Sequence, residues 1–492
     1  MKKLLFCIFF SVLALQGIAQ NTLYTLEDCR TMAMSKNKDI QIAQEKIQVA
    51  TSMKKATFTQ YLPSFSANGG YMWNEKDISL MSEDAYLPVY VNNTDGTKNY
   101  PASWNNSWTM VNGNALPLDA NGVPFDPTKN PEKISWKSTA YLPKEAFEAD
   151  IRNVFAGSIM MTQPLFLGGK IRELNNIANS AKKISEFQLD GKISEILLET
   201  DAAYWRVISL VNKEKLANSY VAMLQKLSGD LEKSILFGVA TKSEGLAVKV
   251  KLNEADMQLL QVQNGLSLSR MLLCQLCGLP LGSDFHLADE DVVHEDALFA
   301  DKDVNVEEAM KDRYEINSLE EMINIAESNR KIMLSRFMPN AVLTAGYLLS
   351  NPNVYNGFSA DFSGMWQVGV VLNVPLFHFG ERIHTLNAAR SEKKIVEYKL
   401  DDAKEKIRLD IAQASFKLSE ASKRLTMTHT NKDKSEENLR YANVGFEAGV
   451  VAPSVLIEAQ TAWLKANSED VDAAIDAKIC DVYLQKALGY LK

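Results

Sequence analysis

Several residue types that mark a familiar class of protein are scarce in this sequence. The 492-residue chain contains five cysteines, five histidines, 24 glycines and 14 prolines. So few cysteines exclude a small disulfide-stapled domain, and the glycine and proline contents exclude collagenous and low-complexity chains. Acidic residues (61) outnumber basic residues (53), which excludes a generally basic nucleic-acid binder. With 46% hydrophobic residues, the chain is large, mildly acidic and able to fold.

Catalytic signatures are also missing. The sequence has no G-x-S-x-G, P-loop, G-x-G-x-x-G or H-E-x-x-H motif. Five histidines spread along the chain form no obvious catalytic cluster. We therefore expect no enzymatic activity, no cofactor and no metal site.

The N-terminus carries an export signal. Lys2 and Lys3 precede an apolar run from Leu4 to Leu15, and Gly17-Ile18-Ala19 follows it. This order predicts a secretory signal peptide over residues 1–19, cut before Gln20, since about 20 apolar residues are needed to span a bilayer. A buried N-terminal helix is the alternative. Neither Cys7 nor Cys29 has the small-residue setting of a lipid-modified cysteine, so we expect no lipid anchor.

The mature chain would keep four cysteines, namely Cys29, Cys274, Cys277 and Cys480. Four in such a length do not form a disulfide framework. Cys274 and Cys277 form a C-x-x-C motif, but it closes an apolar helical run ahead of Gly278, and no second ligand pair follows at zinc-site spacing. We expect these cysteines to pack in a core, with redox or metal chemistry as the alternative.

The chain contains an internal duplication. The segment beginning Pro164-Leu165-Phe166 recurs 211 positions later as Pro375-Leu376-Phe377, and Gly238-Val239 recurs as Gly449-Val450 at the same offset. Upstream, Tyr61-Leu62-Pro63 matches Phe337-Met338-Pro339 at an offset of 276. Because the upstream offset of 276 is larger than the downstream offset of 211, the first copy carries an insertion between the two matched blocks. The predicted divisions are a first copy over 20–281 with an insertion at about 74–151, a linker over 282–304 and a second copy over 305–492.

Each copy is predicted to contain a helix, a strand, a loop, a strand and a long helical hairpin. Residues 65–73 and 366–374 alternate between an apolar and a small or polar face, as strands do. The uncharged run 362–380 also fits a transmembrane helix. Its Pro375, its three glycines and its alternation favour a membrane strand instead. The residues expected to face a wet lumen are Ser64, Ser66, Asn68, Gln367 and Asn373. An interfacial aromatic belt is expected from Tyr71, Trp73, Tyr347 and Trp366.

The helical segments are unusually long. Residues 382–446 contain no proline and no glycine before Gly445, and 170–237 are interrupted only by Gly191 and Gly229. At 1.5 Å per residue each run corresponds to about 100 Å of helix. Apolar positions at three- and four-residue spacing predict coiled-coil-like packing.

Four membrane strands cannot close a barrel, because about eight are needed and unpaired edges are not tolerated in hydrocarbon. Several chains must therefore share one barrel. Three chains give twelve strands, and their twelve long helices would continue as a tube. The fold class expected is mainly α with a small antiparallel β membrane part, built from a duplicated unit as a homotrimer.

The duplicated pattern resembles the TolC family of outer membrane efflux proteins. The resemblance rests on Pro-Leu-Phe-x-x-Gly before each long helix and the Gly-Val pair near each hairpin turn, and it covers about 26–491. It implies an outer-membrane location in a Gram-negative bacterium, with contact to outer-membrane lipid and a large periplasmic part. It also implies a trimeric channel-tunnel that docks to a periplasmic adaptor protein and an inner-membrane transporter of RND or ABC type, without binding nucleic acid.

The resemblance also assigns roles to the hairpin turns. Positions that meet the adaptor in the family are matched by Gly238, Val239, Ser243, Gly449, Val450 and Ser454. The aperture positions are matched by Glu244, Glu458 and Phe446, whereas Val451 stands where a pairing basic residue is expected. The alternatives are ordinary capped turns and solvated helix charges, since Thr241 and Glu244 have capping-box spacing and Pro453 suits a first helical position.

Two segments leave alternatives open. The acidic linker contains His286 and His294, which fits either a solvated connection or a metal-binding patch. The insertion is expected to be an extracellular loop whose Trp104, Trp108 and Trp136 either bind an external ligand or pack the loop.

The leading functional hypothesis is a passive exit duct for small toxic molecules. Type I protein secretion and metal-ion efflux are the alternatives that the same tube would serve. A coiled-coil envelope scaffold or adhesin is the alternative from another class.

Overall fold

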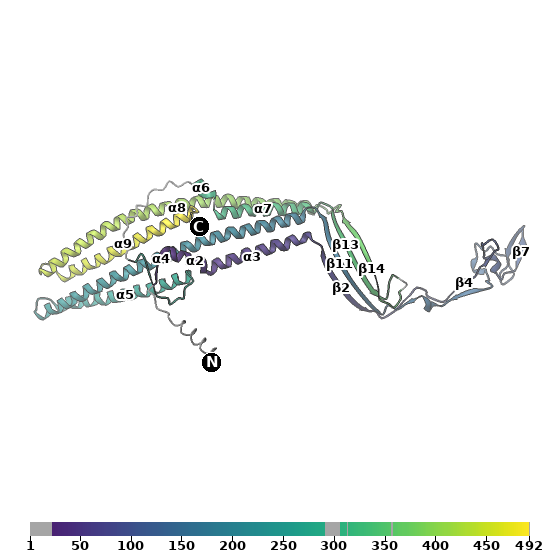
Figure 1. The fold of residues 1–492 in the computed structure, drawn as a ribbon, viewed down its shortest axis with the longest axis horizontal. Coiled ribbons are helices and arrows are strands. Elements are labelled where there is room, and N and C mark those ends of the chain that lie inside the picture. Colours follow the sequence, from purple (N-terminus) through teal and green to yellow (C-terminus); the bar gives the residue numbers. More distant parts are fainter. Residues whose placement is uncertain (1–21, 291–305, 312, 356–357, 492) are drawn as a thin grey trace, which may run out of the picture. The chain divides into compact units, whose positions relative to one another are not determined.

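A computed structural model describes residues 22–290, 306–311, 313–355 and 358–491. They divide into a helical unit, made of the described residues up to Thr59 with Gly168–Met338 and Pro375 onward, and a strand unit of Gln60–Leu167 and Pro339–Val374. Figure 1 shows the elements of each unit. The predicted signal peptide lies outside the described residues, as do positions 291–304 of the linker.

The helical unit is a layer of long helices lying side by side (Figure 1). In chain order they are α2 (Leu26–Lys36), α3 (Lys38–Phe58), α4 (Lys170–Leu236), α5 (Lys242–Leu276), α6 (Val306–Lys311), α7 (Tyr314–Ser335), α8 (Glu381–Glu447) and α9 (Pro453–Ala487). Helix α4 packs against α3, α5, α7 and α9, and α8 packs against α7 and α9. The duplication is confirmed at the level of these elements, because α4 and α8 each have 67 residues and α5 and α9 each have 35.

Helix α4 runs through both glycines that seemed to interrupt it. Gly191 has a packing role, since a Cβ atom there would collide with the ring of Tyr314 at the start of α7. The absent side chain therefore lets the second copy approach the first closely.

The first predicted helix is broken in two at Asn37. Its side-chain oxygen accepts a hydrogen bond from the Asp39 N–H at 2.9 Å and so caps α3. Its amide group donates to the Leu276 carbonyl at the end of α5, at 3.2 Å. The break therefore ties the helix to a segment far along the chain.

The main sheet of the strand unit has four antiparallel strands in the order β14-β13-β11-β2. They are β2 (Ser64–Trp73), β11 (Asn153–Leu167), β13 (Asn340–Asn351) and β14 (Ser363–Asn373). The uncharged run in the second copy is thus a strand, as predicted. The 3-10 turn η1 (Thr59–Tyr61) precedes β2.

The insertion contains four small two-stranded sheets. They pair β3 (Ile78–Ser79) with β10 (Glu148–Ala149), β4 (Ala85–Pro88) with β9 (Thr139–Leu142), β5 (Val91–Asn92) with β6 (Lys98–Asn99), and β7 (Trp108–Val111) with β8 (Asn114–Pro117). Three 3-10 turns accompany them: η2 (Pro101–Ser103), η3 (Pro131–Lys133) and η4 (Lys144–Phe147). Trp104 stacks on Trp108 with ring centroids 5.5 Å apart and meets Trp136 edge-on at 6.0 Å. The tryptophans therefore pack the insertion.

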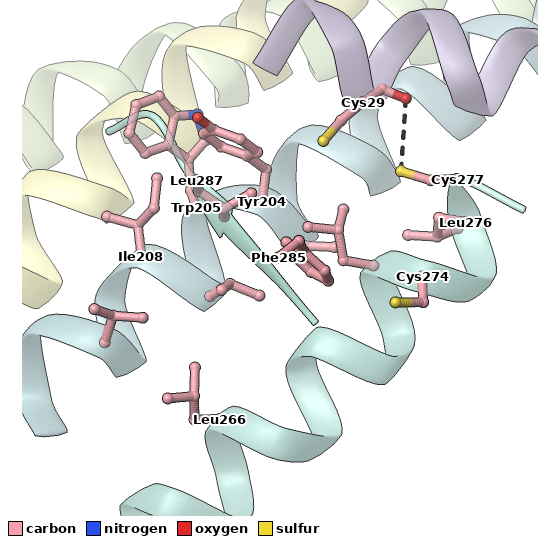
Figure 2. Packing of buried hydrophobic residues seen from close by; sticks show 14 of the residues in the cluster. Cys29, Tyr204, Trp205, Ile208, Leu266, Cys274, Leu276, Cys277, Phe285 and Leu287 are labelled. Atoms are coloured by element: carbon pink, nitrogen blue, oxygen red, sulfur yellow. Dashed lines mark hydrogen bonds between the residues drawn. The ribbon is translucent and has the colours of Figure 1, made fainter. Parts of the chain in front are cut away.

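The predicted acidic linker begins with a buried strand. β12 (Phe285–Leu287) pairs in parallel with β1 (Thr22–Tyr24). Phe285 and Leu287 are each 2% exposed and belong to the largest hydrophobic cluster, with Tyr204 and Ile208 of α4 (Figure 2). The expectation of a solvated connection is wrong for these residues, because their side chains complete a core.

In the described part of the chain, no helix is long and apolar enough to cross a membrane.

Candidate functional site

The four-stranded sheet has one mainly apolar face and one mixed face that carries small, polar and some apolar residues. The pairing aligns Ala67 with Ile159, Ile159 with Tyr347, and Tyr347 with Trp366, so residues from all four strands share a row. The neighbouring row aligns Asn68, Ser158, Leu348 and Met365 on the other face. Trp366 and Val368 on the apolar face are 76% and 74% exposed. Such a surface suits hydrocarbon on one side and water on the other.

The residues predicted to face a lumen share one face of this sheet. Asn68 lies in the row with Ser158, and Gln367 pairs with Gly346 across from Met160. Ser64, Ser66 and Asn373 occupy the same alternation in β2 and β14. The structure thus brings these five residues together, and their exposure to a lumen stays a prediction.

The predicted belt aromatics form two separate groups on the apolar face. Tyr71 packs on Phe155 at 4.9 Å between centroids, and Tyr347 packs on Trp366 at 5.1 Å. Trp73 ends β2 and is 64% exposed. Phe155 was missed by sequence reasoning, although its place in the alternation of β11 would have identified it. Contact of these rings with lipid headgroups stays a prediction.

The turn between α4 and α5 is a complete Schellman motif. Gly238 adopts a φ of 71°, its N–H donates to the Ile235 carbonyl at 3.1 Å, and the Val239 N–H donates to the Ser234 carbonyl at 2.9 Å. These bonds satisfy the last free carbonyls of α4. Gly238 is therefore the left-handed cap of α4.

The turn between α8 and α9 repeats this geometry. Gly449 has a φ of 76°, and its N–H donates to the Phe446 carbonyl at 3.0 Å. The Val450 N–H donates to the Gly445 carbonyl at 2.9 Å. Pro453 occupies the first turn of α9, as predicted. Two tips with the same backbone therefore end the two hairpins.

Both tips present apolar side chains. A Schellman motif commonly buries its second residue beyond the helix against the residue three before the cap. Here those partners are Ser234 and Gly445, which offer Val239 and Val450 no apolar surface, and the two valines are 83% and 80% exposed. Leu236 and Phe237, which the sequence reasoning missed, are 86% and 83% exposed. Ser243 and Ser454 lie exposed in the first turns of α5 and α9.

The predicted aperture residues have different local surroundings. The Glu244 carboxylate accepts hydrogen bonds from the Thr241 N–H at 2.7 Å and from its hydroxyl at 2.8 Å, which forms the predicted capping box. These bonds lower the pKa of Glu244, so it is anionic at neutral pH. Glu458 is exposed on α9. Phe446 is half-buried against a hydrophobic cluster to which Leu439 and Leu456 belong. Whether the three line an aperture stays a prediction.

The four hairpin helices α4, α5, α8 and α9 form a wall. Its two outermost helices, α5 and α8, each carry a row of exposed apolar residues, here called an apolar stripe. Helix α4 packs on α5 and α9, and α9 packs on α8, which leaves α5 and α8 outermost. Spacings of four, seven and eleven residues return to the same side of a helix. At such spacings, the exposed apolar residues of α5 include Leu246, Val250, Met257 and Leu268. Those of α8 include Tyr398, Leu409, Phe416, Met427 and Tyr441.

These stripes lie opposite the buried sides of their helices. On α5 the buried residues include Val248, Ala255 and Leu266, half a turn from the stripe. On α8 they include Ile411, Ala414 and Leu418, again opposite. Each stripe therefore points away from the rest of its own chain's wall.

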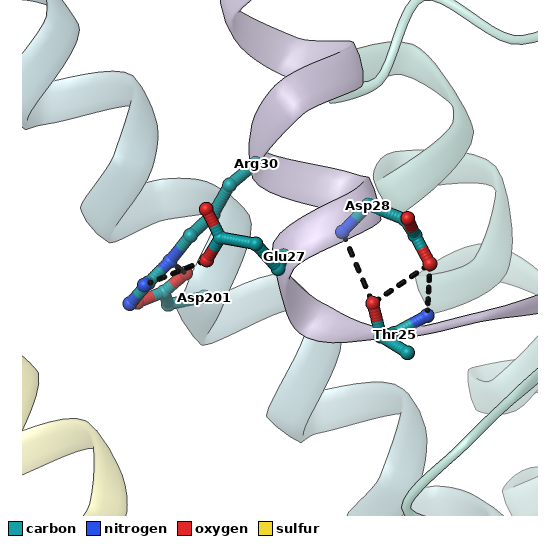
Figure 3. Close-up of polar contacts among 5 residues, drawn as sticks. All are labelled: Thr25, Glu27, Asp28, Arg30 and Asp201. Carbon is teal, nitrogen blue, oxygen red and sulfur yellow. Dashed lines mark hydrogen bonds and ion pairs between the residues drawn. The ribbon is translucent and has the colours of Figure 1, made fainter.

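A buried ion pair fixes α2 to α4. The Arg30 guanidinium donates through Nε to Asp201 Oδ1 at 2.8 Å and through Nη2 to Oδ2 at 2.5 Å (Figure 3). The Asp201 side chain is 1% exposed. The Thr25–Asp28 capping box starts α2 beside this pair. The clamp holds α2 against the middle of α4.

No group of three or more histidine, cysteine or acidic side chains able to hold a metal lies within the described ranges. His286 of the linker instead contacts Glu290, with Nδ1 3.2 Å from Oε2. His294 lies outside those ranges.

Comparison with known proteins gives a consistent result. Residues 305–490 match the family described as outer membrane efflux proteins. No curated protein sequence matches the chain. Among solved structures, the outer-membrane channel OprN is similar at a TM-score of 0.69, with 14% identity, covering 95% of this chain and 91% of its own.

Two further channels give the same picture. The Campylobacter jejuni outer membrane channel CmeC aligns at a TM-score of 0.67 with 15% identity, covering 94% of this chain and 85% of its own. The open-state Neisseria gonorrhoeae outer membrane channel MtrE aligns at a TM-score of 0.67 with 15% identity, covering 95% of this chain and 89% of its own. The fold is that of outer-membrane channels, and the resemblance seen in the sequence is confirmed. The matched family consists of channels rather than enzymes.

Proposed function

We propose that this chain, which has the fold of outer-membrane channels and matches the efflux family over 305–490, forms a homotrimeric exit duct in the outer membrane of a Gram-negative bacterium. The observation that carries the proposal is the two-faced sheet whose outer strands, β2 and β14, each pair on one side only within the described residues. Unpaired backbone groups cost several kcal/mol each in hydrocarbon. Strand β14 of one chain therefore pairs with β2 of the next, and three chains close twelve strands.

The helical stripes support the same ring. The two stripes lie on different helices at opposite edges of the wall, so the contact between chains is head-to-tail, α5 against α8 of the neighbour. Head-to-tail contacts close into rings when the rotation fits. Three chains would bury six stripes and leave no apolar edge in water.

The tips suit a periplasmic adaptor that links the duct to an inner-membrane transporter. Val239 and Val450 are exposed on equivalent Schellman turns, so three chains present six similar apolar tips. The adaptor would cover these side chains. Glu244 and Glu458 would form acidic rings that favour cations. The transported class we propose is small toxic molecules.

Disulfide trapping tests the ring. Cysteine at Ala67 in β2 is combined in turn with cysteine at Val368, Val370 and Leu372 in β14. Within one chain these strands are separated by β11 and β13, about 14 Å at 4.8 Å per strand, too far for a disulfide. We expect at least one pair to give covalent dimers and trimers in membranes under oxidation.

The matched control places cysteines at Ile159 and Tyr347, which oppose each other in neighbouring strands. This pair should close within one chain and leave the monomer mass unchanged. If the control closes and no β2–β14 pair yields an intermolecular product, the shared barrel is refuted.

The adaptor and substrate parts are tested in cells. Replacing both tip valines (Val239→Asp, Val450→Asp) should leave trimers intact and raise drug susceptibility toward that of a deletion strain. Wild-type resistance in the double variant would contradict adaptor docking at the tips. A deletion strain tested against drugs, bile salts, dyes and metals, together with its secreted protein, separates small-molecule efflux from metal efflux and protein secretion.

A further inference from the structure

Two cysteines from distant parts of the chain meet in the main hydrophobic cluster. Cys29 lies in the first turn of α2, and Cys277 is the C-cap of α5, 248 positions later. The Cys277 Sγ atom lies 3.6 Å from the Cys29 carbonyl oxygen, the contact that the dashed line in Figure 2 marks. Their exposed fractions are 1% and 0%. Both thiols are enclosed at the same point of contact between α2 and α5.

Other contacts hold α2 in register with the end of α5. Asn37 donates to the Leu276 carbonyl, and Gly278, at a φ of 66°, lies so close to the Lys36 side chain that a Cβ atom would clash with it. The approach of the two cysteines is therefore part of a packed joint rather than a single chance contact. Cys274 lies one turn back along α5 (Figure 2).

We propose that Cys29 and Cys277 form a disulfide in the exported protein, which covalently joins the start of the mature chain to the end of the first hairpin. The proposal rests on export to the periplasm, which is part of the proposed function. Disulfides persist in that compartment and are rare in the cytosol. The second copy has Leu488 at the position equivalent to Cys277, so the pair is specific to the first copy.

The oxidant is a disulfide-bearing thiol oxidoreductase of the periplasm. The Cys277 thiolate attacks one sulfur of the oxidant's disulfide, forming a mixed disulfide and releasing the oxidant's other sulfur as a thiolate. The Cys29 thiolate then attacks the Cys277 sulfur and displaces the second oxidant thiolate. The chain loses two protons and two electrons, and the oxidant becomes a dithiol.

Because both sulfurs are buried in the folded chain, the reaction takes place before α2 docks. The closed loop would include the first pair of membrane strands and the first long hairpin. Such a long loop loses much unfolded-state freedom when it is closed.

Thiol counting in the full-length protein tests the proposal. Protein from outer membranes is quenched in acid, denatured and treated with maleimide-polyethylene glycol, with or without prior reduction. We expect two adducts on the mature chain without reductant and four with it. The matched control Cys274→Ser should give one adduct without reductant and three with it, whereas Cys29→Ser should give three in both.

Four adducts without reductant would overturn the proposal. The proposal would also be overturned if reduction adds no adducts in Cys274→Ser but still adds two in Cys29→Ser. That result would assign the bond to Cys274 and Cys277. The double variant Cys29→Ala/Cys277→Ala should still conduct in planar bilayers. Loss of the disulfide is thus distinguishable from failure of the channel function, which would abolish conductance in the wild-type protein as well.

Discussion

The two copies have hairpin helices of equal length but fasten them with different side chains. Asn37 and Arg313 occupy equivalent positions, each as the residue before a helix. Asn37 donates one hydrogen bond to the Leu276 carbonyl, the last residue of α5, at 3.2 Å. Arg313 donates to the Ala487 carbonyl, the last residue of α9, at 2.6 Å, and to the Lys486 carbonyl at 3.2 Å. The duplication has kept the joint while exchanging a neutral donor for a cation.

The copies also differ in what surrounds their longest helix. Helix α4 buries 22 of its 67 residues, because helices of both copies cover it. Helix α8 buries 11 of its 67 residues and ends the wall. One sequence pattern thus gives an interior helix in the first copy and an edge helix in the second. In the proposed ring, a neighbouring chain covers this edge.

The largest effect is expected at the exposed edge. Phe416→Asp places a charge in the stripe of α8, where Phe416 is 76% exposed in one chain. If a neighbour covers this side chain, the carboxylate is buried without a partner and trimers should be lost. Size-exclusion chromatography with light scattering in mild detergent measures the mass. The control Thr426→Asp lies about a quarter turn away, and trimers surviving in both variants would mean that the stripe faces water.

The next largest effect is expected at the α2 clamp of the first copy. Arg30→Met leaves the Asp201 carboxylate buried and without its guanidinium, which typically costs 3–5 kcal/mol. Unfolding in guanidinium chloride, followed by helical circular dichroism, should shift to lower denaturant. The double variant Arg30→Met/Asp201→Leu should recover much of this loss. A single variant as stable as the wild type would show that the clamp contributes nothing.

The equivalent joints should differ in strength. Arg313→Met removes two charge-assisted bonds to the end of α9, and we expect local stability there to fall by about 2–3 kcal/mol. Asn37→Ala removes one neutral bond from the end of α5, at about 1 kcal/mol, and also removes the cap of α3. Hydrogen exchange of the terminal amides of α5 and α9, read by mass spectrometry, compares them. If the ends of α5 and α9 lose equal protection, asparagine and arginine stabilise the two joints equally.

The smallest effect is expected at Glu244. Its folded pKa is lowered by the Thr241 N–H and hydroxyl, so its stabilising contribution is present above the unfolded value near 4.3 and is lost as pH falls through the folded pKa. Glu244→Gln should therefore lower the melting temperature slightly at pH 7, with the difference vanishing in acid.

In planar bilayers, Glu244→Gln/Glu458→Gln should reduce cation selectivity. Unchanged selectivity would remove both carboxylates from the aperture.

Much of this architecture could be predicted from the sequence because its signals are local. Pro63 and Pro339, the alternation in β2 and β14 and the glycines at both tips act within a few residues, and the prolines and the tip glycines each occur at equivalent positions of the two copies. The chemistry of the tips was predictable for the same reason, since a left-handed cap and a capping box each have a short signature.

The features that escaped prediction depend on distant partners. Asn37 resembles any polar helix residue until the Leu276 carbonyl lies beside it. Phe285 and Leu287 are hidden in an acidic segment, and their pairing with Thr22–Tyr24 joins three-residue strands with no local signature. Arg30 and Asp201 would each pass for a solvated helix charge, and only the packing of α2 on α4 buries them.

The equal helix lengths constrain how such a chain can evolve. Removing one residue from α4 would turn everything beyond it by 100° and draw its tip back by about 1.5 Å, while α8, its counterpart in the second copy, kept its full length. The buried side would then rotate into water. Length changes are tolerable only in steps that restore phase, seven or eleven residues, and only if both copies change together. The two hairpins must therefore keep matching lengths, and a change of length in one requires the same change in the other.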